Sequence, residues 1–141
     1  MKANKVAVQS AALLAVGVAI AIGSAMSDEV LTPAKSMPFK KVMPGVEKAG
    51  LWGSPAGEHA SLTRMAAGFK AGKHTHKHEV RMLVVEGTII HTDAKGAVTE
   101  LTKGAYRMVP GGIEHDTACA AGQDCLFVES LPGAFDLKAV K

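Results

Sequence analysis

Short apolar runs, each ended by a turn signal, follow one another along the chain and restrict its fold most. They are 60–67 (ASLTRMAA), 80–87 (VRMLVVEG), 88–92 (TIIHT), 97–102 (AVTELT), 106–110 (YRMVP) and 125–130 (CLFVES). Runs of this length and spacing are typical of all-β sandwiches and barrels. The sequence contains no internal repeat, and its length of 141 residues suits a single domain. We therefore predict an all-β domain with one hydrophobic core.

The first 27 residues, MKANKVAVQSAALLAVGVAIAIGSAMS, differ in kind from the rest. Lys2 and Lys5 form a basic start, and an apolar run is followed by small residues that end at Ala25. This is the layout of a secretory signal peptide, and the run is shorter than the roughly 20 residues of a membrane-spanning helix. We predict a signal peptide over 1–25, cleaved after Ala25. The mature chain would then be periplasmic or secreted, without stable membrane association. An uncleaved N-terminal anchor is the alternative.

The charge of the chain argues against nucleic acid as a partner. The sequence has 16 Lys and Arg residues against 13 Asp and Glu residues. Loss of Lys2 and Lys5 with the signal peptide leaves 14 basic residues, and the formal charge falls to +1. A surface that binds a polyanion needs clustered basic residues, and the sequence has no such cluster.

Proline and glycine are frequent in residues 26–51, which include Pro33, Pro38, Pro44 and Gly50. These residues interrupt regular structure, so we expect an irregular N-terminal arm over 26–51. The folded domain is then expected over 52–141.

Three of the six histidines alternate within residues 73–80 (KHTHKHEV). Alternate side chains of a β-strand point to the same face, so His74, His76 and His78 would share one face. On a flat strand His74 and His78 would lie roughly 13 Å apart. That separation makes it hard for both residues to bind one ion.

Two glycine-framed motifs place these histidines in a wider pattern. Their fixed residues are Gly68, His74, His76 and Gly87 in the first, and Gly104, Pro110, Gly112 and His115 in the second. Their order and spacing resemble the two signature motifs of the cupin superfamily, over about residues 52–131. The resemblance implies a single-domain cupin-type β-barrel, also called a double-stranded β-helix or jelly roll. It also implies that a homodimer is plausible, because such barrels often pair through edge strands.

The resemblance further implies that His74, His76 and His115 bind one divalent transition metal near the mouth of the barrel. Inward-facing side chains from different strands converge inside a small barrel. Neutral imidazoles suit Fe, Mn, Ni, Zn and Cu, so the identity of the metal stays open.

The first motif departs from the family at its acidic ligand. The family glutamate is expected four or five residues after the second histidine, where this chain has Val80 and Arg81. Glu79 is the nearest acid, with the wrong parity for a flat strand, but a β-bulge could turn it inward. We expect Glu79 as the fourth ligand, and His78 is the alternative.

Two classes of function fit this pattern. The first is a metal-dependent enzyme, similar to cupin dioxygenases or isomerases, that acts on a small molecule. Glu79 and Arg81 are the candidates for orienting its substrate. The second is a metal- or ligand-binding module without turnover, as in sensory cupins. His59 and His91 stand alone in the sequence and are expected at the surface or rim rather than as ligands.

Cys119 and Cys125 are the only cysteines, and the AAGQD segment between them has the composition of a turn. An exported protein meets an oxidising environment, so we predict a disulfide between them. The alternatives are two free buried thiols, or Cys119 as a soft metal ligand near His115.

Overall fold

The computed structural model describes residues 29–141, and the predicted signal peptide lies outside the described residues. One short 3-10 helix, Ala34–Ser36, precedes the strands. The strands are β1 (Lys40–Met43), β2 (Val46–Gly53), β3 (His59–Met65), β4 (His74–Thr75), β5 (Val80–Glu86), β6 (Ile89–Thr92), β7 (Val98–Leu101), β8 (Tyr106–Val109), β9 (Asp116–Cys119), β10 (Cys125–Leu131) and β11 (Lys138–Ala139). Within residues 29–141, no helix has the length and apolar character needed to cross a bilayer.

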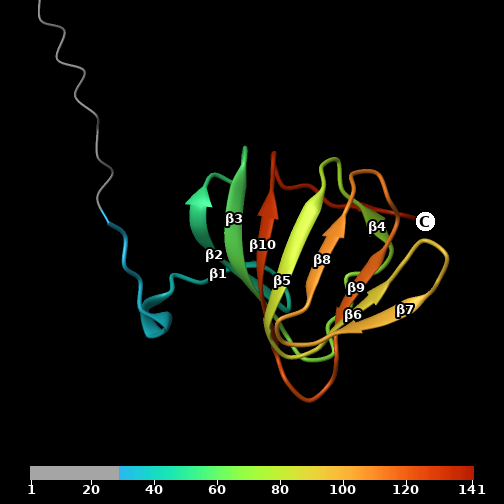
Figure 1. Ribbon diagram of the computed structural model, residues 1–141, viewed down its shortest axis with the longest axis horizontal. Coiled ribbons are helices and arrows are strands. Elements are labelled where there is room, and N and C mark those ends of the chain that lie inside the picture. Colours follow the sequence, from blue (N-terminus) through green and yellow to red (C-terminus); the bar gives the residue numbers. More distant parts are fainter. Residues whose placement is uncertain (1–28) are drawn as a thin grey trace, which may run out of the picture. The chain divides into compact units, whose positions relative to one another are not determined.

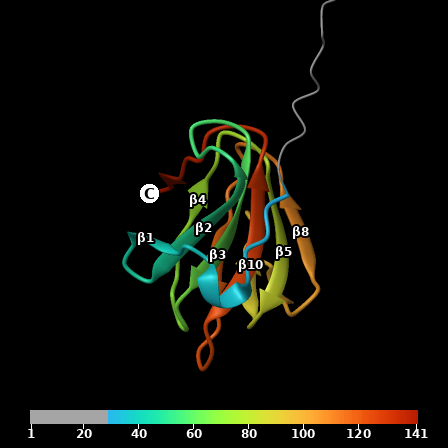
Figure 2. The ribbon, with the colours of Figure 1, turned by 90° about the vertical axis from the view of Figure 1, so that its left-hand side faces the viewer.

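The strands form three antiparallel sheets. The largest has the order β1-β2-β3-β10-β5-β8, the second has the order β7-β6-β9, and β4 pairs with β11 near the C-terminus. The six-stranded sheet faces the smaller sheets (Figure 1). Figure 2 looks onto the six-stranded sheet, and its strands lie side by side in that view. The chain crosses between the layers from β5 to β6, from β7 to β8, and again before and after β9. The predicted all-β barrel of jelly-roll type is confirmed.

The core forms where inward-facing side chains of the two layers meet. Along β5, Val80, Met82 and Val84 are buried, whereas the residues between them are more exposed. The same alternation runs along β10, where Phe127 is fully buried. The apolar cluster that results contains Val46, Met65, Met82, Val84, Ile89, Cys119, Cys125 and Phe127.

The prediction of an irregular N-terminal arm is wrong for residues 40–51, because these residues form β1, the turn after it and most of β2. β2 pairs with β3 from Val46 opposite Met65 to Gly53 opposite His59. Gly45 adopts a φ of 81° in the turn between β1 and β2. The pairing of β2 with β3 shifts register after Gly50. Proline and glycine here therefore mark a hairpin turn and a bulge.

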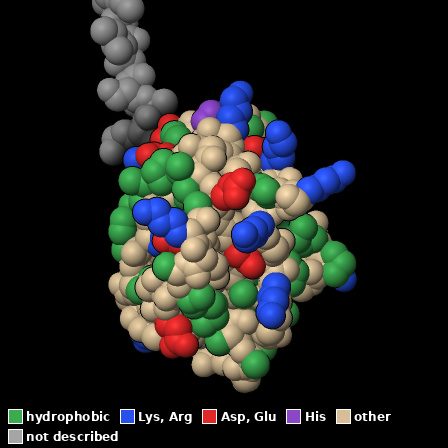
Figure 3. Space-filling view, turned by 90° about the vertical axis from the view of Figure 1, so that its right-hand side faces the viewer, with side chains coloured by type: hydrophobic (Ala, Val, Ile, Leu, Met, Phe, Trp, Pro, Cys, Tyr) green, Lys and Arg blue, Asp and Glu red, His purple; other side chains and the backbone are tan. Residues whose placement is uncertain are grey.

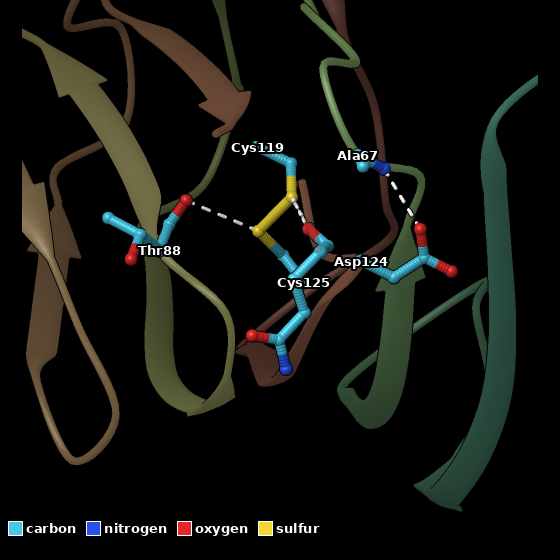
Figure 4. Close-up of a disulfide and its surroundings, with 6 residues drawn as sticks. Ala67, Thr88, Cys119, Asp124 and Cys125 are labelled. Atoms are coloured by element: carbon cyan, nitrogen blue, oxygen red, sulfur yellow. Dashed lines mark hydrogen bonds between the residues drawn. A yellow bond between two sulfur atoms is a disulfide. The ribbon is translucent and has the colours of Figure 1, made fainter. Parts of the chain in front are cut away.

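The predicted disulfide is confirmed: Cys119 and Cys125 are joined across the turn between β9 and β10, two strands of different sheets (Figure 4). This turn is also held to the turn after β3, since the Ala67 amide donates a hydrogen bond of 2.9 Å to the Asp124 carboxylate. Gly87, the last glycine of the first motif, packs against the turn between β9 and β10. It has a φ of 75°, and a Cβ there would lie 2.7 Å from the Asp124 carbonyl oxygen.

Replacement of Gly87 by alanine is expected to lower the free energy of unfolding by about 3 kcal/mol, since it combines a left-handed backbone with a backbone clash. Gly96 is a matched control, because it has a φ of 84° and open space around it. Gly96→Ala should cost only about 1 kcal/mol. Urea unfolding of both variants measures the difference. Equal losses would show that close packing against the disulfide-linked turn does not require Gly87.

Charged side chains of both signs are spread over the face shown in Figure 3. Lysine and arginine side chains lie among aspartate and glutamate side chains there, with apolar and backbone surface between them. The electrostatic field over this face is therefore mixed rather than uniformly basic.

Candidate metal centre

The side chains of His74, His76 and His115 meet inside the barrel. Their ligand atoms all lie within 4.8 Å of one another, and all three side chains are buried. The ring centroids of His74 and His115 are 4.4 Å apart, and those of His74 and His76 are 4.9 Å apart. The structure thus brings together the histidines of both sequence motifs.

Backbone pairing produces this convergence. The His74 amide donates to the His115 carbonyl oxygen at 2.9 Å, and the His115 amide donates back at 3.0 Å. The Gly112 amide also donates to the His76 carbonyl oxygen at 2.7 Å. At Gly111 a Cβ would clash with the Lys77 carbonyl oxygen. The glycines of the second motif therefore let its turn pack directly on the backbone that carries the first.

Each of the three imidazoles is held by a hydrogen bond from Nδ1 to a backbone carbonyl oxygen. The acceptors are Gly72 for His74 (2.6 Å), Ile113 for His115 (3.0 Å) and Asp136 for His76. A carbonyl can only accept, so Nδ1 carries the proton and Nε2 keeps its lone pair. The buried Nε2 of His115 has no hydrogen-bond partner among the described residues. This donor set fits a divalent transition metal.

Burial favours the neutral form of His115 and of His76. It lowers the pKa of His115 to about 4, although the hydrogen bond to Ile113 acts in the opposite direction. Burial also lowers the pKa of His76, against the effect of the hydrogen bond to Asp136. Both side chains are therefore in the metal-binding form at neutral pH.

The metal-free protein is expected to lose stability as the pH falls from 6.5 towards 4. In the unfolded chain His115 titrates near 6.5, whereas in the folded chain its pKa is about 4. Between these values the unfolded state binds more protons, so the free energy of unfolding decreases as the pH decreases. Urea midpoints in the presence of a chelator at pH 7, 6 and 5 measure the effect. His115→Gln should flatten the dependence, and an unchanged slope would contradict the assignment to this residue.

Contrary to expectation, the structure does not bring Glu79 into the histidine cluster. β4 ends at Thr75, and the chain bends at residues 77–78 before β5 begins. After this bend Glu79 forms an ion pair with Arg81, whose side chain is 54% exposed. Neither residue of that pair lines the large cavity described below.

His78 also leaves the cluster at this bend, and its ring lies against Gly133, where a Cβ would meet the imidazole. The bend thus separates His78 from the two histidines that precede it, because the alternation of a single strand does not continue past Thr75. The described residues within metal-binding distance of one another are the three histidines alone.

A cavity of about 650 Å³ adjoins the centre, and His74 and His76 line it. Its apolar walls include Val46, Met65, Val80, Met82 and Phe127, and its polar lining includes Lys48, His59, Arg107, Thr117 and Glu129. A space of this size and character can hold a small molecule beside the imidazoles.

Sequence reasoning missed two charged residues of this interior, Glu129 and Arg107. Glu129 lies between Phe127 and Leu131 on the same buried face of β10, and its carboxylate lies 2.7 Å from the Lys48 ammonium. Arg107 is buried in β8 on the same face as Val109. A charged residue with the parity of an inward-facing strand position was the available signal in both cases.

The expectation of a position at the surface or rim is also wrong for His59. His59 is buried and lines the cavity, where its Nδ1 donates to the Gly57 carbonyl oxygen at 2.8 Å. His91 is partly buried, and its Nδ1 accepts a hydrogen bond of 3.1 Å from Arg107. Neither joins the three histidines of the centre.

Comparison with known proteins bears on this arrangement. A family model described as the ChrR Cupin-like domain matches residues 27–133. No curated protein gives a significant match to the sequence.

Solved structures share the fold at low sequence identity. The polyketide cyclase RemF from Streptomyces resistomycificus is 18% identical with a TM-score of 0.68, over 82% of this chain and 87% of that chain. An RmlC-like cupin from Shewanella frigidimarina is 22% identical with a TM-score of 0.61, over 74% and 92%. A chain in the complex of Rhodobacter sphaeroides SigE with the anti-sigma ChrR is 18% identical with a TM-score of 0.58, over 70% of this chain and 50% of that chain. At these identities the likeness concerns the fold alone.

Proposed function

The chain belongs to the ChrR cupin-like family of the cupin superfamily, and from this premise we propose that it is a metal-dependent cupin acting on a small molecule. His74, His76 and His115 would hold one divalent transition metal through Nε2. The observation that carries the proposal is that all three imidazoles are fixed through Nδ1, with their ligand atoms together beside a cavity. When bound, such a metal supplies Lewis-acid or oxygen-activating chemistry.

The residues of this chain have separate tasks in the proposal. Three protein ligands leave coordination positions open for a substrate atom, as in catalytic rather than structural metal sites. The apolar walls exclude water from the bound molecule, and the polar lining residues orient it. Because Glu79 and Arg81 pair outside the cavity, Arg107 and Glu129 replace them as the candidates for contact with the substrate.

Metal analysis of the protein purified without an affinity tag tests the proposal. We expect close to one Fe, Mn, Ni, Zn or Cu per chain after dialysis. The same protein is then treated with a chelator and reloaded with each metal in turn. The metal that returns to the amount per chain found in the untreated protein is the one that the centre binds. Metal well below one per chain under all these conditions would reject the proposed centre.

A sensory module without turnover is the second candidate function. Two findings favour it: the description of the matching family, and the solved complex in which an anti-sigma protein shares the fold. Incubation of the metal-loaded protein with small molecules that bind it separates the two functions. Chemical change of a bound molecule supports an enzyme, whereas saturable binding with full recovery of the molecule supports a sensor.

We propose export as the setting of this function, with cleavage after Ala25. The sequence of the first 27 residues supports it, and the disulfide between Cys119 and Cys125 suits an oxidising compartment. The intact mass of the protein isolated from the periplasm or medium should equal that of residues 26–141 with one disulfide. A mass that retains residues 1–25 would contradict the proposal and support an anchor.

A further inference from the structure

Arg107 is a buried cation without a carboxylate partner. Its residue exposure is only 9%, and it lies in β8 with its guanidinium toward the interior. Its Nη1 donates to the Thr117 hydroxyl at 2.9 Å and to His91 at 3.1 Å, both of which are uncharged acceptors. Its Nε has no partner among the described residues. A buried charge of this kind is costly unless an opposite charge compensates it.

The acid that attracts Arg107 is already engaged in an ion pair with another residue. Residues 29–141 contain three ion pairs, Lys48–Glu129, Arg64–Glu47 and Arg81–Glu79, and Arg107 takes part in none of them. Glu129 attracts Arg107 at longer range, but its carboxylate lies 2.7 Å from Lys48. Burial lowers the pKa of Arg107 to about 10, so the guanidinium still carries its charge at neutral pH. The interior therefore keeps one positive charge in excess.

That excess charge lies on the wall of the cavity that adjoins the histidines. Arg107 and Thr117 line the cavity together with Phe127 and Met82. Lys40, the other lining cation outside the three ion pairs, is exposed to solvent. The lining thus combines a buried, uncompensated cation with extensive apolar surface. A guanidinium recognises a carboxylate through paired hydrogen bonds, and apolar walls favour a hydrocarbon body.

We propose that Arg107 forms an anion subsite of this cavity and that the ligand is a small monocarboxylate with an apolar body. The carboxylate would lie at Arg107, and the hydrocarbon body would lie among the apolar residues beside the metal centre. This inference rests on the proposed function, because it takes the cavity beside the histidines as the ligand site. It adds the chemical class of the molecule, which the three histidines do not specify.

Octanoate is a suitable probe, with 1-octanol and octylammonium as controls of the same chain length. Binding is measured by calorimetry on chelator-treated protein, so that a carboxylate–metal bond cannot account for the preference. We expect octanoate to bind at least about tenfold more tightly than 1-octanol, and octylammonium to bind more weakly than both. Failure of the wild-type protein to bind octanoate, or equal binding of octanoate and 1-octanol, would overturn the inference.

Variants assign the preference to one residue. Arg107→Gln should reduce octanoate affinity about tenfold and leave 1-octanol affinity nearly unchanged, whereas Arg107→Lys should retain part of the preference. Arg81→Gln is the matched control, since Arg81 is exposed and paired with Glu79, and it should behave like the wild type. Thermal unfolding confirms that each variant is folded. Unchanged octanoate affinity in folded Arg107→Gln would overturn the inference.

Metal content is measured on the same preparations and reports separately on the proposed function. A carboxylate preference in protein that binds no metal would reject the metal centre and retain the anion subsite. Stoichiometric metal without a carboxylate preference would retain the centre and reject the subsite.

Discussion

Replacing His115 by alanine is expected to remove metal from the protein, with bound metal after dialysis falling from about one per chain to below a tenth. His115 is the proposed ligand that the second motif contributes, and without it His74 and His76 leave two imidazoles on one short segment. The buried Nε2 of His115 has no hydrogen-bond partner in the described part of the chain. Removal of Nε2 therefore takes away the proposed metal-binding atom but no hydrogen bond within the described part of the chain.

His78→Ala and Glu79→Ala are the controls for this experiment. Both residues lie next to the centre in sequence but outside it in the structure, so both variants should keep their metal. His91→Ala extends the test, because the His91 ring lies 5.9 Å from that of His115 and is not part of the cluster. Full retention of metal in His115→Ala would show that the two motifs do not form one site. Loss of metal in Glu79→Ala would instead restore the acidic ligand expected from the family pattern.

The sequence predicted the strands whose apolar runs are bounded by a turn signal, including strands of four residues. It missed β9, which is also four residues long. β3, β5, β6, β7, β8 and β10 all fall within one or two residues of the predicted runs. β4 and β11 are only two residues long, too short to give a pattern. β1 and β2 were missed because the bulge near Gly50 and the turn at Gly45 break their alternation. The pairing of β2 with β3 overrides these local breaks.

Residues of the candidate site could be predicted where a sequence motif specifies them. They could not be predicted where the path of the backbone determines the position of the side chain. His74, His76 and His115 follow from the two motifs, and the structure brings them together. The positions of Glu79 and His78 depend on the bend at residues 77–78, which a flat-strand interpretation cannot include. The interior charges were missed for another reason. Whether a polar residue faces a cavity or solvent depends on the layer opposite, which a single strand does not reveal.

The ion pair between Lys48 and Glu129 is expected to be the most costly one to break. The side chains are 18% and 10% exposed, and Glu129 lies on the inner face of β10. Lys48→Met keeps the aliphatic chain but leaves a carboxylate in an apolar cavity without its closest counter-charge. We expect the free energy of unfolding to fall by about 3 kcal/mol, at the lower end for a buried pair because Arg107 still attracts Glu129.

The pair between Arg64 and Glu47 provides a matched control. It joins β2 to β3, whereas Lys48–Glu129 joins β2 to β10. It is 3.0 Å long, but its side chains are 42% and 43% exposed. Both cations lie over a phenylalanine ring, Lys48 over Phe135 and Arg64 over Phe39, so that contact is lost in each case. Arg64→Met should therefore cost less than about 1 kcal/mol. Urea unfolding at pH 7 measures both variants.

A double variant separates the loss of the pair from the burial of an uncompensated charge. Lys48→Met combined with Glu129→Gln removes both charges, so it should recover most of the stability lost in Lys48→Met alone. If Lys48→Met costs no more than Arg64→Met, Glu129 does not depend on Lys48 for compensation. Glu129 would then compensate Arg107 instead, and Arg107 would no longer be the uncompensated cation of the cavity. The same measurement therefore tests the electrostatic premise on which recognition of a carboxylate depends.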